Sequence, residues 1–248
     1  MARVLLKILN ALMTISAAVV ILLFASYSIY ALWDNEQIYA SADDVQTDML
    51  KRKPKIDPES GGASFEELLA INKDVCAWIT LDNTKIDHPV LQGENLLTYI
   101  NTDVYGEFAL AGSIFLDTAN DRTFQDSYSL IYGHHMANHK MFGDLDLYEN
   151  EDFFRENTSG TLILPDRSYK LEIFACLLVA SSEDAIFHPG QWLDNIDGLL
   201  AFVNSNAKYL REETMRDLQQ DEHPQVVGLS TCSSDFTNAR TVILARMI

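Results

Sequence analysis

An uncharged run near the N-terminus constrains this chain more than any other feature. Residues 8–33 (ILNALMTISAAVVILLFASYSIYALW) contain no charged side chain, and about 20 apolar residues suffice to cross the hydrocarbon core of a bilayer. Arg3 and Lys7 precede the run and acidic residues follow it. Because positive charge favours the cytoplasmic side, we expect a single-pass cell-membrane anchor. Its N-terminus would be cytoplasmic, and everything after Trp33 extracellular.

A cleaved signal peptide is the alternative interpretation of this run. The apolar core of a signal peptide is normally about 7–15 residues long and is followed by a cleavage site of small residues. The run here is longer and ends with the aromatic residues Tyr27, Tyr30 and Trp33, although Ala25 and Ser26 leave a cleavage site open. Its length and its aromatic end favour an uncleaved anchor.

The remainder of the chain is strongly acidic. All 36 acidic residues follow the apolar run and 16 of the 18 basic residues do, which gives the exported part a net charge of −20. Binding to nucleic acid depends on clustered Lys and Arg, so we expect no nucleic-acid partner. With 248 residues, 48% of them hydrophobic, the chain can bury one sizeable core.

Three segments are expected along the chain. Residues 1–33 form the cytoplasmic tip and the anchor, residues 34–63 form a helical stalk that passes into a linker, and residues 64–248 form the globular domain. Ser64 and Glu67 have the spacing of a capping box, which predicts a short helix that begins there and ends near Asn72.

The globular domain contains a series of strand-like runs separated by turn residues. They lie at residues 77–81, 88–92, 112–117, 127–135, 160–165, 169–180, 225–230 and 241–248. Such a series predicts a mainly β domain, a barrel or a sandwich, with accessory helices. Between the sixth and seventh runs lies an insertion, residues 181–224, in which the apolar residues have helical spacing.

An odd number of cysteines leaves at least one thiol outside any internal disulfide. Cys76 and Cys176 lie in apolar runs, where cysteine behaves as a small hydrophobic residue, and whether the two pair stays open. Cys232 lies among Ser and Thr at the end of a strand-like run. The candidate for a reactive thiol is therefore Cys232.

Two stretches carry the candidate chemistry. In VVGLSTCSSDFTNARTVILARMI, two strand-like runs flank a polar segment, so Cys232 and Arg240 should face each other across the mouth of a hairpin. In LIYGHHMANHKMFGDL, an apolar strand ends at Gly133, His134 and His135. A cysteine nucleophile needs a proton acceptor or a cationic neighbour, which a histidine supplies.

A zinc site is the competing interpretation of the histidines. His135 and His139 are four residues apart and, with His134, form a conceivable ligand set. The metalloprotease pattern requires Glu directly after the first histidine, and HHMANH has none. We therefore expect neither a metal nor another cofactor. Histidines that merely cap a strand and bond to the backbone are the alternative for His135 and His139.

These stretches together resemble the sortase family, the membrane-anchored cysteine transpeptidases of Gram-positive bacteria. LSTCSSDFTNAR, LIYGHHM and MFGDL carry the resemblance, and TKIDHPVLQ, GSIFLD, IFACL and the helical insertion make it most similar to class B sortases. It extends from about residue 65 to residue 248, plus the anchor. The resemblance implies a sortase-type eight-stranded β-barrel with Cys232 as nucleophile, His134 as catalytic histidine and Arg240 as catalytic arginine.

The resemblance also implies the reaction. Cys232 would form a thioester with a secreted protein that bears a C-terminal sorting motif, commonly of the Asn-Pro-x-Thr type. The acceptor would be an amine of the cell-wall peptide or its lipid-linked precursor, or alternatively a pilin lysine. A secreted cysteine hydrolase and an anchored binding module with an incidental cysteine are the other candidates.

Further residues are expected to contact the substrate. Ser230 and Thr231 would bond to the substrate backbone or to the local loop. In the insertion, Ile186, Phe187 and Trp192 are the apolar candidates for the motif groove, with a purely structural cover as the alternative role of the insertion.

Overall fold

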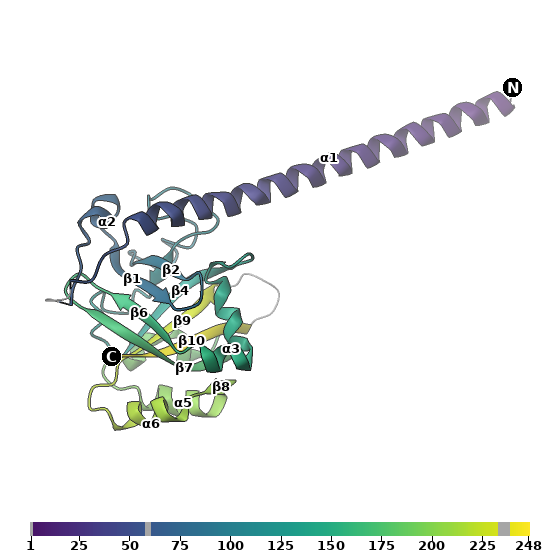
Figure 1. The fold of residues 1–248 in the computed structure, drawn as a ribbon. Helices are drawn as coiled ribbons and strands as arrows, with labels where there is room; N and C mark the ends of the chain where they lie inside the picture. Colours follow the sequence, from purple (N-terminus) through teal and green to yellow (C-terminus); the bar gives the residue numbers. More distant parts are fainter. Residues whose placement is uncertain (1, 58–60, 233–238) are drawn as a thin grey trace. The chain divides into compact units, whose positions relative to one another are not determined.

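The computed structural model describes residues 2–57, 61–232 and 239–248, with Cys232 described by its backbone (Figure 1). The strands are β1 (Val75–Leu81), β2 (Asp87–Leu91), β3 (Ile114–Leu116), β4 (Tyr128–Met136), β5 (Lys140–Met141), β6 (Ser159–Ile163), β7 (Ser168–Ala180), β8 (Tyr209–Leu210), β9 (Val226–Cys232) and β10 (Ala239–Met247). The helices are α1 (Ala2–Lys51), α2 (Glu66–Ile71), η1 (Gly143–Glu149), α3 (Glu151–Glu156), α4 (Asp184–Phe187), η2 (Pro189–Trp192), α5 (Asp197–Asn206) and α6 (Glu212–Gln220).

The strands close into a barrel. Neighbouring strands follow the order β10, β9, β4, β3, β2, β1, β6 and β7, and β7 pairs with β10 to complete the circle. The β2–β3 and β4–β9 pairings are parallel, and β5 and β8 are short additions to β4 and β7. The predicted eight-stranded barrel is confirmed, and each of the eight predicted runs overlaps one of its strands.

Alternating side chains of the barrel strands supply two apolar clusters. On β10, Ile243 and Ala245 belong to the barrel core, whereas Val242 and Leu244 belong to a second cluster outside it. This is the two-residue period of a strand that is buried on both faces. Burial of each such aliphatic side chain stabilises the fold by roughly 1.5–3 kcal/mol.

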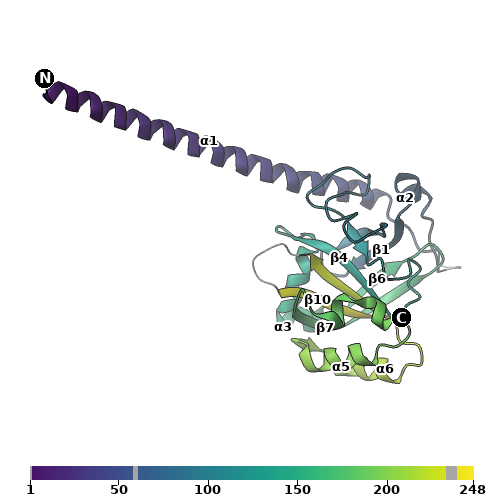
Figure 2. The same ribbon diagram turned by 180° about the vertical axis from the view of Figure 1, so that it is seen from behind.

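The insertion covers the outer cluster with helices, as its spacing predicts. Buried residues of α5 and α6 belong to that cluster, and the two helices lie side by side in both views (Figures 1 and 2). In α6, Thr214, Met215 and Leu218 are buried while the charged residues face outward. This amphipathic spacing fixes the helix to the outer face of the barrel.

The compact barrel unit begins before the predicted globular domain. Contacts divide the chain into one unit that ends at Ser41 and a second that spans Ala42–Ile248. In the second unit, Met49 of α1 is buried with Phe65 and Leu68 in a third apolar cluster. The helical stalk therefore continues to Lys51 and its last turns belong to the compact unit.

The predicted capping box does not form. Helix α2 is present over Glu66–Ile71, but its N-cap is Phe65, and no side-chain hydrogen bond caps it within the described part of the chain. Phe65 is buried in the third apolar cluster. Packing of this side chain, rather than the Ser64 hydroxyl, sets the start of the helix.

Candidate active site

The parallel pairing of β4 with β9 brings His134 level with Cys232. Its register joins Tyr132 to Ser230, Gly133 to Thr231 and His134 to Cys232. Paired strands lie about 4.8 Å apart, so the two backbones are immediate neighbours although a long stretch of sequence separates them.

Arg240 lies on the other side of Cys232. The antiparallel β9–β10 register pairs Ser230 with Val242, and two further residues along each strand bring Cys232 level with Arg240. The Arg240 Nη1 donates a hydrogen bond of 3.0 Å to the Thr231 carbonyl. The three predicted catalytic residues thus occupy the ends of three adjacent strands. The Cys232 side chain and residues 233–238 of the hairpin lie outside the described residues.

A backbone carbonyl orients the His134 ring. Its Nε2 lies 2.7 Å from the Ile100 carbonyl oxygen, in the long β2–β3 connection. Because a carbonyl oxygen only accepts, Nε2 carries the proton in this contact. His134 is half-buried, so its ring is held against the protein while part of it still faces the solvent.

Gly133 lets the end of β4 approach its neighbours. A Cβ atom at this position would lie 2.4 Å from Ile114 Cδ1 and 2.8 Å from two atoms of the Phe142 ring. These distances are well inside the 3.5–4.0 Å or so at which carbon atoms pack. The absence of a side chain therefore determines where His134, the next residue, is placed.

The other two cysteines are poor nucleophiles. Cys76 and Cys176 are buried and form no disulfide within the described part of the chain, which answers the open question of their pairing. Burial raises the pKa of each thiol to about 12, so both are protonated at neutral pH. Since a thiolate is the attacking form, these two thiols are excluded as the reactive group.

His135 and His139 pair with carboxylates. His135 Nε2 lies 2.7 Å from Asp146 Oδ2, and His139 Nδ1 lies 2.5 Å from Asp144 Oδ1, both on η1. The hydrogen bond from His135 and its charge hold the pKa of Asp146 below its usual range. Each of these two rings thus contacts a carboxylate side chain, whereas the alternative considered for them was a bond to the backbone.

Comparison with known proteins identifies the fold and the family. No protein-family model matches the chain. The chain is 36% identical to a Streptococcus pyogenes class B sortase involved in pilus biogenesis, with a TM-score of 0.67 over 75% of this chain and 98% of that one. The sortase B of Listeria monocytogenes is 29% identical over 188 residues, which cover 74% of each chain. A Staphylococcus aureus sortase B–substrate complex is 25% identical, with a TM-score of 0.65 over 87% of this chain and 96% of that one.

The chain belongs to the class B sortases. As a member of this family it is a cysteine transpeptidase built on an eight-stranded barrel. Helix α1 is long and apolar enough to cross a membrane. A signal sequence near the N-terminus would meet the same requirement of length and composition.

Ser230 and Thr231 are buried directly before Cys232 on β9. The Ser230 hydroxyl donates a 3.2 Å hydrogen bond to the Thr231 carbonyl, the same oxygen that accepts from Arg240. The Thr231 carbonyl thus connects the Ser230 hydroxyl and the Arg240 guanidinium at the end of β9. Their contact with a substrate stays a prediction.

The three apolar residues of the insertion differ in exposure. Ile186 is completely buried in the outer cluster, so it offers no surface to a peptide in this conformation. Phe187 and Trp192 are half-buried against that cluster, and the Trp192 Nε1 donates a 2.8 Å hydrogen bond to the Ala185 carbonyl. Both rings keep an exposed part, which a groove residue needs.

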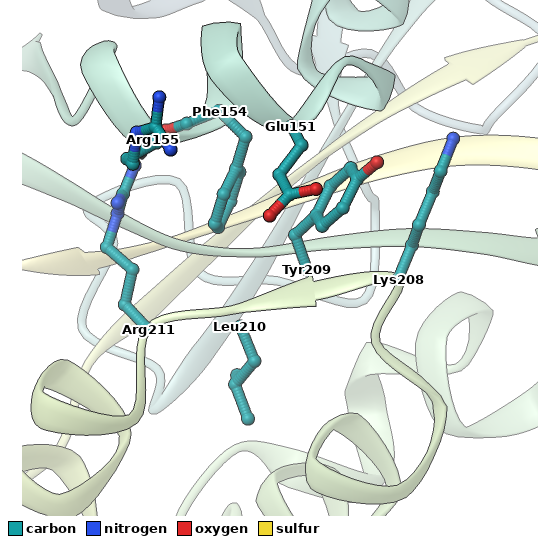
Figure 3. Close-up of a pocket in the computed structure, with 7 residues that line it drawn as sticks. All are labelled: Glu151, Phe154, Arg155, Lys208, Tyr209, Leu210 and Arg211. Atoms are coloured by element: carbon teal, nitrogen blue, oxygen red, sulfur yellow. Dashed lines mark hydrogen bonds between the residues drawn. The ribbon is translucent and has the colours of Figure 1, made fainter.

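A pocket of about 310 Å³ lies between α3 and β8 of this sortase (Figure 3). The Phe154 and Tyr209 rings stack in it with centroids 5.5 Å apart. Lys208 lies against the Tyr209 ring and Arg211 against the Phe154 ring. Lys208 and Arg155 each form an ion pair with a carboxylate, and Arg211 donates to backbone carbonyls. The cations of the pocket therefore already have protein partners.

Sequence reasoning missed four groups around the site. They are the Ile100 carbonyl, Asp146 and Glu149 on η1, and Thr241 on β10. The acidic residues of GDLDLYE, one turn apart beside the histidine stretch, are the one signal that could have indicated η1.

Proposed function

We propose that this sortase cleaves a C-terminal sorting motif of a secreted protein and joins the protein to an amine of the cell-wall peptide or its lipid-linked precursor. Cys232 would be the nucleophile, His134 the general acid and base, and Arg240 the stabiliser of the oxyanion. The observation that carries the proposal is the register of three adjacent strand ends, in which Cys232 lies between His134 and Arg240.

The first half of the reaction releases an amine. The Cys232 thiolate attacks the carbonyl carbon of the scissile peptide bond and forms a tetrahedral oxyanion. When the carbon–nitrogen bond breaks, protonated His134 gives its proton to the departing amine, which leaves a thioester on Cys232. The Ile100 carbonyl, which accepts from His134 Nε2, keeps the ring oriented in the resting enzyme.

The second half reverses the roles. The acceptor amine attacks the thioester carbonyl, His134 takes the amine proton, and the carbon–sulfur bond breaks to restore the thiolate. A new peptide bond forms, so no oxidant or cofactor is required. The same three groups serve both halves because the two tetrahedral intermediates are alike.

Arg240 suits the oxyanion role for physical reasons. Its guanidinium is planar, stays charged and presents several donors, so one nitrogen can hold the Thr231 carbonyl while another meets the oxyanion. A well-placed donor of this kind is worth about 10²–10³ in kcat.

The substrate and the topology follow from the same proposal. The Staphylococcus aureus relative forms a complex with a substrate, which supports a peptide donor, and the Asn-Pro-x-Thr type of motif is the one we propose. Phe187 and Trp192 would contact its apolar part, and Ser230 and Thr231 its backbone. The apolar part of α1 would anchor the enzyme with a cytoplasmic N-terminus and an extracellular catalytic domain.

A pilin lysine is the alternative acceptor. This alternative is supported by the 36% identity between this chain and the Streptococcus pyogenes class B sortase, which is involved in pilus biogenesis. Hydrolysis by water would use the same residues, whereas a binding module would need none of them.

A ligation assay separates these functions. The full chain in detergent is mixed with a pool of sorting-motif peptides and with a glycine or lysine amine, and products are read by mass spectrometry, with Cys232→Ala as control. A peptide–amine product that the control lacks supports transpeptidation, and the amine selected separates wall anchoring from pilus assembly. Cleaved peptide alone supports a hydrolase, and equal silence of both proteins contradicts the catalytic assignment.

A further inference from the structure

Behind the proposed catalytic residues lies a polar network that joins the ends of β4 and β10. Thr241 Oγ1 lies 3.1 Å from Asp146 Oδ1 and 2.9 Å from Glu149 Oε1. Asp146 also meets His135, and Glu149 forms a 3.4 Å ion pair with Lys208. The chain of contacts thus runs from β4, through η1, to β10 and on to the residue before β8.

The network lies on the opposite face of the sheet from Arg240. On β10, Val242 belongs to the outer cluster and Ile243 to the barrel core, so alternation puts Arg240 on the outer side and Thr241 on the core side. On β4, Leu130 and Ile131 show the same division, which puts His134 outside and His135 behind it. The two members of the network that lie on barrel strands, His135 and Thr241, are therefore the chain neighbours of the proposed catalytic residues His134 and Arg240.

On its β7 side the start of β10 is held by backbone pairing, in which Arg240 lies opposite Val179 and Thr241 opposite Leu178. On its β9 side the described pairs run from Arg246–Val226 to Val242–Ser230, and the Arg240 guanidinium contacts β9 through the Thr231 carbonyl. The Thr241 side chain is buried, and its single hydroxyl hydrogen is shared between two carboxylates. Contacts to η1 thus fix the start of β10 from behind, one residue from the guanidinium.

We propose that Thr241 is a positioning residue, which holds Arg240 against the nucleophile strand through Asp146 and Glu149. This inference rests on the proposed function, because it assigns Thr241 a task only if Arg240 acts on the Cys232 thiolate and the oxyanion. The charged or titratable groups around the hydroxyl include Asp146 and Glu149 on η1, His135 on β4, Lys208 before β8 and the buried Cys176 on β7.

The test compares variants that differ by one hydroxyl. Thr241→Val keeps the branched shape and removes the hydroxyl, and Thr241→Ser restores the hydroxyl. Thr80→Val is the matched control, because Thr80 Oγ1 also donates to a carboxylate, at 2.9 Å from Asp87 Oδ1, but lies on β1. All variants are made in the full chain, and their thermal unfolding is recorded alongside.

Alkylation of Cys232 by iodoacetamide, followed against pH, reports on the position of Arg240 without a substrate. Cys232→Ala gives the background from the two buried thiols. Displacement of the guanidinium raises the pKa of the thiolate, so we expect Thr241→Val to react about three- to tenfold more slowly near pH 6, and Thr241→Ser and Thr80→Val to match the parent chain. With a peptide substrate, kcat of Thr241→Val should fall about tenfold or more at nearly unchanged KM.

The outcomes separate the two proposals. If Arg240→Ala slows alkylation while Thr241→Val follows the parent profile, the positioning role is wrong and the proposed function stands. If Arg240→Ala changes neither the alkylation profile nor kcat of the ligation, the proposed role of Arg240 is itself contradicted. Asp146→Asn is the second variant should Thr241→Val fail to fold, and a parent-like profile there would equally overturn the inference.

Discussion

A single methyl group added at Gly133 should lower the catalytic rate strongly while the chain still folds. In Gly133→Ala, the new Cβ would lie 2.4 Å from Ile114 Cδ1 and 2.8 Å from the Phe142 ring. Packing contacts between carbons need about 3.5–4.0 Å, so the strand end must move by several tenths of an ångström to about 1 Å. Both neighbours are buried, with 1% and 0% of their surface exposed, which leaves the displacement to fall on β4.

The magnitude follows from two separate costs. Insertion of a methyl group into a filled core costs about 1–3 kcal/mol of unfolding free energy, and in a chain of this size that lowers Tm by about 2–12 °C. A displacement of about 1 Å at a catalytic group costs up to about 100-fold in rate. We expect kcat/KM to fall about 10- to 100-fold at a temperature where the variant is fully folded.

Gly190→Ala provides the matched control. Its new Cβ would meet only Ala119 Cβ, at the ordinary distance of 3.6 Å. Stability should stay the same or rise by about 0.4–1 kcal/mol, because alanine restricts the unfolded chain, and activity should be unchanged. Thermal unfolding and the peptide ligation rate measure both variants.

A second substitution tests whether the contact with Ile114 causes the loss of stability and activity in Gly133→Ala. Ile114→Val removes Cδ1, the atom that Gly133→Ala would approach most closely, so the double variant should recover part of the lost stability and activity relative to the two single variants. Parent-like stability and rate in Gly133→Ala, or no recovery in the double variant, would contradict the role assigned to Gly133.

The remaining predictions concern pH and the guanidinium. Burial lowers the pKa of His88 from 6.5 to about 4, so the unfolded chain takes up this proton first, and the stabilisation present above pH 6.5 is lost as the pH falls toward 4. We expect the free energy of unfolding, measured with urea, to fall between pH 7 and pH 5 by about 2 kcal/mol more in the parent chain than in His88→Gln. Equal decreases in the two proteins would contradict the lowered pKa of His88. Arg240→Lys keeps the charge but not the planar fork, so kcat in the ligation assay should fall about tenfold or more. A parent-like rate would show that charge alone suffices.

The barrel was predictable from the sequence because its strands are buried on both faces. Runs such as residues 169–180 and 241–248 are mostly apolar, and polar, turn-forming residues precede each of them, so local composition suffices to locate β7 and β10. The apolar spacing of the insertion likewise predicted α5. These features depend on residues that are close together in the chain.

Other features depend on contacts between distant segments. The level pairing of His134 with Cys232 arises from the parallel β4–β9 register, which only barrel closure sets. The end of α1 belongs to the compact unit because Met49 finds an apolar partner in Phe65, and that same packing displaces the expected cap at Ser64. The burial of Ile186 depends on the outer cluster beneath it.

The polar network around Thr241 could not be predicted from the sequence either, because it also depends on contacts between distant segments. Asp146, Glu149 and Thr241 come from η1 and β10, far apart in the chain, and a polar side chain next to Arg240 reads as an ordinary surface residue. A motif match directs attention to His134, Cys232 and Arg240, whereas the groups behind them become visible only when the strands are in register.

The mass of the acyl-enzyme decides whether Cys232 is the nucleophile. The full chain is incubated with a sorting-motif peptide without an amine acceptor, and the intact protein is weighed and then mapped by proteolysis. We expect an added acyl mass on Cys232 that Cys232→Ala lacks and that an added amine converts into ligated peptide. An adduct on a different residue, or ligated product from Cys232→Ala, would contradict this expectation.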